Sequence, residues 1–215
     1  MRPQRVDHVA LLVPDPERIG ERLRARLPLR VLERTEEFVL LGRAPERGKI
    51  TLVRAEGSRE AGPLVRLAIG VPCAAAASRL DLDLPLEVSL VPAPAEGEVD
   101  LDHLALAVPD PAASMRAWRD LGFAAEAPAD GAARVRLGSF ALELHPGSPE
   151  PARRPLLGHL GLLVESAEQA RREAEAGGLT VTRTVDAELS RAVFVQGPDG
   201  VEVELVEHKP AFALV

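Results

Sequence analysis

The sequence predicts an α+β fold made of a repeated unit, in which one strand is followed by one helix and then by two or three more strands. Four strand-like segments share one pattern, and each reaches a valine five residues after its first member. Turn signals at 138–139 (Gly-Ser) and 198–200 (Pro-Asp-Gly) mark further strands after the helices. The four segments begin at His8, Arg66, His103 and His159. Such a repeat is typical of a fold assembled from small modules.

Residues typical of helix starts follow three of the four segments. They are Asp15 with Pro16, Asp110 with Pro111, and Ser166 with Gln169. We therefore place the modules at about 4–55, 64–93, 101–146 and 157–208. The second module is too short for three strands after its helix, so the N-terminal half is expected to lack part of its sheet.

Each initial strand has one face that carries a polar residue beside a small one. The small residues are Ala10, Ala68, Ala105 and Gly161. The opposite face is branched aliphatic, which suits packing in a core. The small-residue face therefore leaves room for something other than core packing.

Composition excludes several classes of partner. The formal charge is −7 with scattered arginines, which argues against nucleic acid and anionic membranes. No apolar run reaches the roughly 20 residues of a membrane span, and we expect a cytoplasmic protein. Cys73 is the single cysteine, so an internal disulfide is excluded and a small buried residue is expected there. A small molecule or another protein remains, with the chain as a monomer or homodimer.

The repeated unit resembles the vicinal oxygen chelate superfamily, which includes glyoxalases, extradiol dioxygenases and bleomycin-resistance proteins. The resemblance rests on the histidine near the start of the first strand and on Pro-Asp-Gly-x-x-x-Glu before the last one. It implies that modules pair into cup-shaped mixed sheets. We expect a degenerate N-terminal pair over 1–93 without a metal site, a linker over 94–100, and a C-terminal pair over 101–215.

The resemblance also implies a ligand set for one divalent metal ion inside the C-terminal cup. The implied ligands are His103, Glu143, His159 and Glu204. Two imidazoles and two carboxylates suit Fe, Mn, Co, Ni or Zn, and leave positions for the oxygens of a substrate. Two carboxylates in one enclosed cup repel each other, and a divalent cation removes that penalty.

Strand register leaves a rival interpretation for Glu143. A two-residue turn at 138–139 sets Arg134 directly across from Glu143, which is the geometry of a plain cross-strand ion pair. For Glu204, a three-residue turn sets the aromatic Phe194 across from it instead. The ligand interpretation is therefore better supported for Glu204, whereas the two interpretations of Glu143 stay open.

The N-terminal half serves as an internal comparison. Its positions equivalent to the last-strand glutamates are Thr51 and Ser89, and its first strands carry His8 and Arg66. We therefore expect no metal there and a structural role for His8.

Other side chains have weaker assignments. Arg136 shares a strand face with Glu143 and is a candidate for binding an anionic substrate, as Phe194 is for contacting it. Trp118 has the helical spacing of a core residue. His145 is either a neighbour of the site or an exposed strand end.

Three reaction classes follow from the resemblance. A filled fourth ligand position favours a glyoxalase-like or epimerase-like enzyme, in which Glu143 or Glu204 moves a proton at carbon. An extradiol dioxygenase uses two His and one Glu on Fe(II), but its characteristic Tyr position holds Phe194, and the chain contains no tyrosine. The third class, small-molecule binding without catalysis as in bleomycin-resistance proteins, lacks this ligand set.

Overall fold

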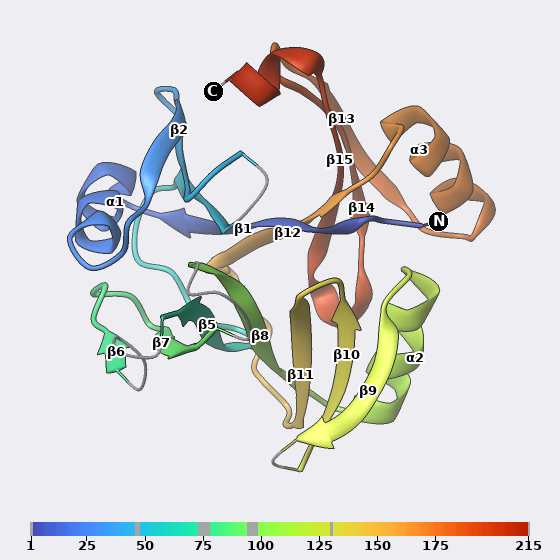
Figure 1. Ribbon diagram of the computed structural model, residues 1–215. Coiled ribbons are helices and arrows are strands. Elements are labelled where there is room, and N and C mark those ends of the chain that lie inside the picture. Colours follow the sequence, from blue (N-terminus) through green and yellow to red (C-terminus); the bar gives the residue numbers. More distant parts are fainter. Residues whose placement is uncertain (1, 46–47, 73–77, 94–98, 130, 215) are drawn as a thin grey trace.

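A computed structural model describes residues 2–45, 48–72, 78–93, 99–129 and 131–214 (Figure 1). Cys73 and most of the expected linker lie outside the described residues, so the predictions about them remain predictions. The described chain forms two mixed sheets of eight and seven strands, with helices at their sides. This confirms the predicted α+β fold of repeated modules.

The eight-stranded sheet combines the first and the fourth module. Its order is β13-β14-β15-β12-β1-β4-β3-β2. From the first module come β1 (Arg5–Val13), β2 (Arg30–Arg34), β3 (Phe38–Gly42) and β4 (Lys49–Arg54). From the fourth come β12 (Leu157–Leu163), β13 (Val181–Asp186), β14 (Ser190–Gln196) and β15 (Glu202–His208). The two modules meet where β1 pairs antiparallel with β12.

The seven-stranded sheet combines the second and the third module, in the order β6-β7-β5-β8-β11-β10-β9. The second module supplies β5 (Leu64–Val71), β6 (Ser78–Leu80) and β7 (Glu87–Pro92). The third supplies β8 (Asp100–Val108), β9 (Ala124–Ala129), β10 (Ala132–Leu137) and β11 (Phe140–Pro146). Only two strands follow β5 among the described residues, so the expected truncation of the second module is confirmed.

The pairing of modules corrects one expectation. We expected neighbours in sequence to pair, as 1–93 and 101–215, but the outer two modules share one sheet and the inner two share the other. The physical reason is that all four initial strands carry the same pattern, so the pattern of one strand does not select its partner. Selection depends on side-chain fit across the β1–β12 and β5–β8 contacts, which sequence periodicity does not reveal.

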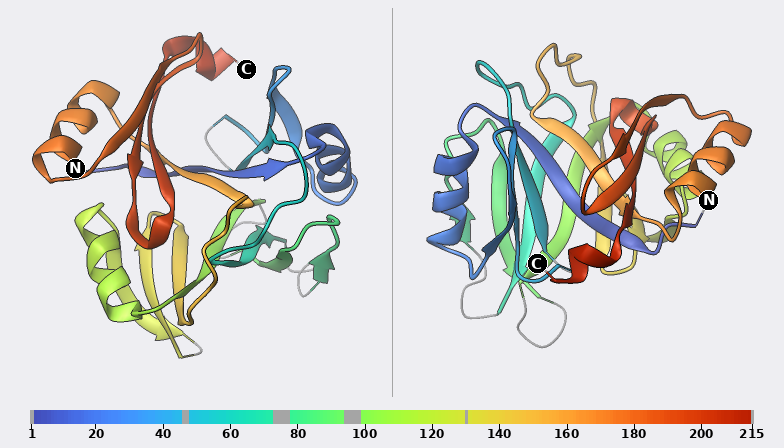
Figure 2. Two further views of the ribbon diagram at one scale, coloured as in Figure 1. Left: turned by 180° about the vertical axis from the view of Figure 1, so that it is seen from behind. Right: turned by 90° about the horizontal axis from the view of Figure 1, so that it is seen from above.

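Three helices begin at the predicted caps. These are α1 (Pro16–Arg24), α2 (Pro111–Asp120) and α3 (Ala167–Ala176), capped by Asp15, Asp110 and Ser166. Each cap side chain accepts hydrogen bonds from backbone N–H groups of the first turn, which satisfies donors that the helix itself leaves free. The helices lie at the outer sides of the sheets, α1 against β3 and β4, and α3 against β14 and β15 (Figures 1 and 2).

One continuous apolar core joins the two sheets and the helices. It takes alternate residues of each initial strand, such as Leu11, Leu67, Leu104 and Leu160, all at most 1% exposed. The other faces, which carry His8 and His103, point away from this core. The molecule therefore has two separate polar sheet faces, one on each sheet.

A turn of the fourth module contacts a helix of the third. Asp199, in the 3₁₀ turn η2 (Pro198–Gly200), accepts hydrogen bonds from the Ser114 hydroxyl and from the Trp118 indole N–H, at 2.5 and 2.9 Å. Trp118 is fully buried, as expected for a core residue. The Pro-Asp-Gly turn thus connects the two sheets in addition to reversing the chain.

Among the described residues, no helix has the length and apolar character of a membrane span.

Candidate metal centre

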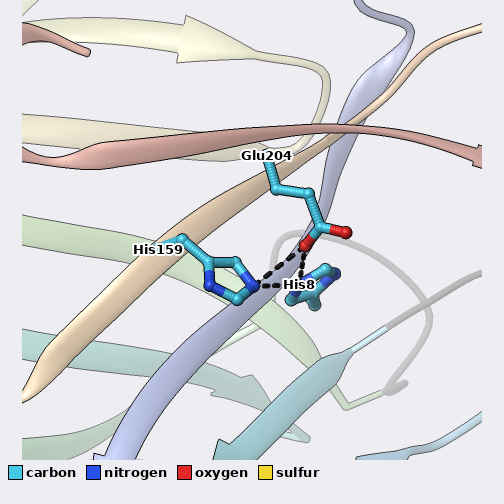
Figure 3. Close-up of side chains that lie close together, drawn as sticks. All are labelled: His8, His159 and Glu204. Carbon is cyan, nitrogen blue, oxygen red and sulfur yellow. Dashed lines mark hydrogen bonds and ion pairs between the residues drawn. The ribbon is translucent and has the colours of Figure 1, made fainter. Parts of the chain in front are cut away.

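Three donor atoms converge on the polar face of the eight-stranded sheet (Figure 3). The Nε2 atoms of His8 and His159 are 3.0 Å apart, and the Glu204 Oε2 lies 3.0 Å from the first and 2.9 Å from the second. All three residues are less than 10% exposed. The residues come from three neighbouring strands: β1, β12 and β15.

Strand register explains why the three side chains meet. Ala10 pairs with His159, His8 pairs with Gly161, and Gly161 in turn pairs with Glu204. A Cβ atom at Gly161 would lie only 2.4 Å from the His8 ring. The glycine therefore provides the space into which the His8 imidazole folds toward the other two donors.

A β-bulge brings a second carboxylate to His8. The β1–β12 register shifts between Val6 and His8, so Asp7 is the extra residue, and its side chain reaches the same site as that of its neighbour. The Asp7 Oδ2 lies 2.9 Å from the His8 Nδ1. Because Asp7 is ionised, Nδ1 carries a proton and donates it in a hydrogen bond to Asp7, so Nε2 is the nitrogen that can bind a metal once its own proton has left.

Two neighbouring side chains contact the Asp7 carboxylate, one an ammonium group and one an imidazole. The Lys49 Nζ lies 2.7 Å from the Asp7 Oδ1, and the His208 Nε2 is 3.2 Å from the same oxygen. Lys49 is 1% exposed and lies over the Phe212 ring, which belongs to the C-terminal turn η3 (Pro210–Leu214). Behind His8 therefore lies a buried ion pair of Asp7 and Lys49, with the partly exposed His208 beside it.

The electrostatics of the site favour a cation. Burial disfavours the charged imidazolium of His8, but the Glu204 charge and the Asp7 hydrogen bond outweigh it and raise the His8 pKa to about 9. Burial also opposes ionisation of Glu204, yet His8 and His159 hold the pKa of this carboxyl well below its usual range. His159 has a lowered pKa, mainly because it is buried. The site thus holds a carboxylate and attracts positive charge.

The donor set fits a divalent metal ion. Two imidazole nitrogens and one carboxylate oxygen are ligands for borderline ions such as Fe, Mn, Co, Ni and Zn. Bonds of about 2.1 Å at right angles place neighbouring ligands roughly 3.0 Å apart. The measured separations of 2.9 to 3.0 Å therefore match one triangular face of an octahedron.

The fourth equivalent position in this cup is Thr51. It pairs with Ala10 as Glu204 pairs with Gly161, so the position expected from the module repeat is confirmed by the register. Thr51 brings a neutral hydroxyl, not a second carboxylate. The site is consequently a face of two histidines and one glutamate.

The other two expected ligands, His103 and Glu143, lie on the seven-stranded sheet. Their neighbour is Arg66, whose guanidinium donates to the His103 Nε2 at 3.2 Å and to the Glu143 Oε2 at 2.8 Å. Arg134 lies across from Glu143 as expected, but its guanidinium is farther away, with 3.8 Å between the Arg134 Nη1 and the Glu143 Oε1. Arg66 pairs with Ala105, which pairs with Glu143, as His8 pairs with Gly161, which pairs with Glu204, so Arg66 occupies in this second cup the place that His8 has in the first.

The expected grouping is thus corrected. His159 and Glu204 do lie together, but their third partner is His8, for which we expected a structural role, and not His103. Each of the four residues was placed at a position within its own module, but the module that pairs with it was misassigned. The pairs Asp7-His8 and Asp102-His103 share the same bulge and the same hydrogen bond, 2.9 and 2.6 Å long. That shared Asp-His dipeptide was a sequence signal that His8 is the same kind of side chain as His103, which we expected to be a ligand.

The remaining candidates also divide between the cups. Phe194 contacts His159 edge to face with ring centroids 5.1 Å apart, and it pairs with Glu204 as expected. Arg136 lies on the other sheet, where it donates to Glu126 and to the Ser139 carbonyl at 2.8 and 2.7 Å. His145 is 3.6 Å from Glu143 in the second cup.

Fold and site together define a two-sheet α+β protein with one candidate two-His, one-Glu centre. Residues 100–205 match the family model described as the Glyoxalase/Bleomycin resistance protein/Dioxygenase superfamily. Residues 100–205 therefore carry a domain of this superfamily, and the resemblance found in the sequence is confirmed. No match is found among curated proteins.

Solved structures share the fold over nearly the whole chain. A "putative dioxygenase" from Bacillus subtilis is 14% identical, with a TM-score of 0.77 over 99% of this chain and 87% of that one. Glyoxalase I from Zea mays is 16% identical, with a TM-score of 0.69 over 94% of this chain and 92% of that one. At these identities the likeness concerns the fold alone.

Proposed function

We propose that this protein is a metal-dependent enzyme of the dioxygenase type, which acts on a small molecule with vicinal oxygens. The observation that carries the proposal is Thr51 at the fourth ligand position. Three protein donors on one face, with the remaining positions open, are the arrangement of non-haem Fe(II) oxygenases. The similarity to the Bacillus subtilis protein is in keeping with this proposal through the fold only.

The ligand set also weighs against the other two reaction classes. The glyoxalase-like interpretation depended on a fourth carboxylate, and Glu143 is instead bonded to Arg66 on the other sheet. Binding without catalysis would not need three converging donors, which cost free energy to bury without a partner. The lyase or isomerase reaction, the cytoplasmic location and the monomeric or dimeric state remain predictions from the sequence.

The residues of the chain have distinct roles in this proposal. His8, His159 and Glu204 bind the ion, and Asp7 fixes the His8 ring in the tautomer that can do so. Phe194, only 4% exposed, packs against His159 and keeps water from that side of the site. A bound Fe(II) would supply Lewis acidity and one-electron redox chemistry to the substrate oxygens and to O₂.

Matched carboxamide variants test the site. We expect purified protein to hold about one metal ion, Glu204→Gln to lose it on dialysis, and Glu143→Gln to keep it. Equal metal loss in both variants would show that the chosen site is wrong.

Oxygen uptake tests the reaction class. Protein loaded with Fe(II) without air should consume O₂ when 1,2-dihydroxybenzene is added, and Glu204→Gln should not. Turnover of a hemithioacetal by Ni- or Zn-loaded protein, without O₂ uptake, would instead support the lyase or isomerase class.

A further inference from the structure

We propose that Arg183, stacked on Phe194, forms an anion-binding position on the wall of the metal cup, so that the substrate carries a carboxylate or similar acidic group besides its vicinal oxygens. This inference rests on the proposed function for the oxygens and adds the second recognition element. It names a class of substrate, a small organic acid, that the metal ligands alone do not specify.

Register places Arg183 on the same side of the sheet as the metal ligands. Arg183 on β13 pairs with Phe194 on β14, which pairs with Glu204 on β15. Paired residues of neighbouring strands project to the same face. With strands about 4.8 Å apart, the backbone of Arg183 is roughly 10 Å from that of Glu204. A separation of this size accommodates a ligand that consists of one small ring with an acidic substituent.

The guanidinium is oriented before any ligand arrives. Its central carbon lies 3.6 Å from the Phe194 ring centroid, a cation–π stack that fixes its plane. Phe194 in turn contacts His159 edge to face. Arg183 is thus connected to a metal ligand through one aromatic ring.

Arg183 also retains capacity for an incoming anion. Its side chain is 52% exposed, and its hydrogen bond to the Glu202 Oε2 is long at 3.4 Å. The other Glu202 oxygen accepts a shorter bond of 2.8 Å from the Thr182 hydroxyl. Glu202 therefore neutralises Arg183 only in part, and donors remain for two-point recognition of a carboxylate.

Two other basic side chains are not available for this role. Lys49 is 1% exposed and is held by Asp7 at 2.7 Å. Arg136, the anion-binding candidate from the sequence, lies on the other sheet and is bonded to Glu126.

The opposite wall of the cup is apolar. Leu32 and Leu40 from the first module pack with Phe212, and Phe38 and Leu189 pack at their edge. Leu32, Leu40 and Phe212 are each at most 7% exposed, so they close this side of the cup and offer no polar partner to an acidic group.

A pair of probes that differ by one carboxylate tests the inference. Protein loaded with Co(II), which reports ligand binding in its visible spectrum, is titrated with 1,2-dihydroxybenzene and with 3,4-dihydroxybenzoate. We expect the acid to bind about tenfold more tightly to the wild type. Arg183→Met should abolish that difference and leave 1,2-dihydroxybenzene unaffected, whereas Arg183→Lys should retain part of it. Arg191→Met, in the same hairpin but paired with Glu207, is the control.

A third probe separates this inference from the proposed function. Benzoate lacks vicinal oxygens, and its binding is followed by ligand-observed NMR with and without Co(II). If the dihydroxy probes leave the Co(II) spectrum unchanged, the proposed function fails, but Arg183-dependent benzoate binding still supports the anion site. Equal affinities for both dihydroxy probes, or benzoate binding that Arg183→Met does not weaken, overturn the anion site whatever the metal does.

Discussion

The Lys49 ammonium lies 2.7 Å from the Asp7 carboxylate, and the two side chains are 1% and 2% exposed. The pair is therefore shielded from solvent almost completely. Burial lowers the pKa of Lys49 and opposes ionisation of Asp7, yet His208, His8 and Lys49 together hold the Asp7 pKa well below its usual range. Asp7 thus stays ionised behind the candidate ligand His8, and this position leads to the first prediction.

Lys49→Met should weaken metal binding although Lys49 touches no metal. Without the ammonium, Asp7 becomes a buried carboxylate with weaker support and orients His8 less well. Outer partners of ligating histidines typically contribute 10- to 100-fold in affinity, so we expect a loss of about tenfold. Breaking a buried pair also costs about 3–5 kcal/mol of unfolding free energy. Calorimetric titration with Co(II) measures the first effect, and urea unfolding the second.

The control for Lys49 is Lys209→Met, since Lys209 pairs with the exposed Asp186. It should change neither quantity. Unaltered Co(II) affinity in a folded Lys49→Met protein would show that Asp7 orients His8 without this lysine.

Gly161→Ala should displace the His8 ring. The added methyl would stand 2.4 Å from Cε1 and 2.5 Å from Nδ1 of that ring, and real contacts are never so short. We expect metal content to fall at least severalfold while the fold persists. Gly20→Ala, in the interior of α1, is the matched control, because its added methyl would meet the neighbouring side chains at an ordinary distance of 3.6 Å. Replacing a glycine inside a helix should raise the free energy of unfolding by about 0.5–1 kcal/mol. Full metal content in Gly161→Ala would contradict the assigned ring position.

A second metal centre should be obtainable in the seven-stranded sheet. Arg66 faces Ala105 as His8 faces Gly161, and Ala105 faces Glu143 as Gly161 faces Glu204. We therefore expect the double variant Arg66→His, Ala105→Gly to bind two Co(II) ions per chain. A control variant with Gln instead of His at position 66, and with the same second substitution to glycine, should bind one Co(II) ion per chain. Elemental analysis decides, and a count of one in the His variant would refute the equivalence of the two cups.

Asp199→Ala should loosen the contact between the sheets. Trp118 is fully buried, and its indole N–H would lose its acceptor, which costs about 1–3 kcal/mol. Asp83→Ala is the control, because Asp83 also has a positive φ (59°, against 58° for Asp199) but pairs only with exposed Arg18. Thermal unfolding of both variants separates the hydrogen bond from the backbone conformation. Equal changes would assign the effect to the backbone.

Metal affinity should rise with pH up to about 9. The His8 pKa is raised to about 9 in the metal-free protein, so below that pH a metal must displace a proton. For the same reason the metal-free protein gains stability from this proton below pH 6.5 and loses it as pH rises through 9. Co(II) titrations between pH 6.5 and 9 check the first effect. Affinity independent of pH in this range would mean that His8 is already unprotonated.

The sequence predicted the module boundaries, the helix caps and the cross-strand partners of Glu143 and Glu204, because all of these are local. Hydrophobic period and turn length determine them within one module. The choice of partner module is different, since β1 could pair with any initial strand of the same pattern. His8 was consequently assigned to a cup without carboxylates, although its position within the module was recognised. Arg183 was missed because Thr182 forms a bulge that strand alternation does not show.

The nested arrangement of the modules has a consequence for how the chain is made. His8 and His159 touch across 151 positions of sequence, whereas the inner modules join β5 to β8 within a much shorter span. On the ribosome, β1 can pair with β4 of its own module, but its other edge must wait unpaired until β12 of the fourth module has emerged, while the inner pair can already close. Exposed strands of this kind are prone to aggregate. A metal ion that joins the first module to the last would then act as a check on completed synthesis, since no truncated product could retain it.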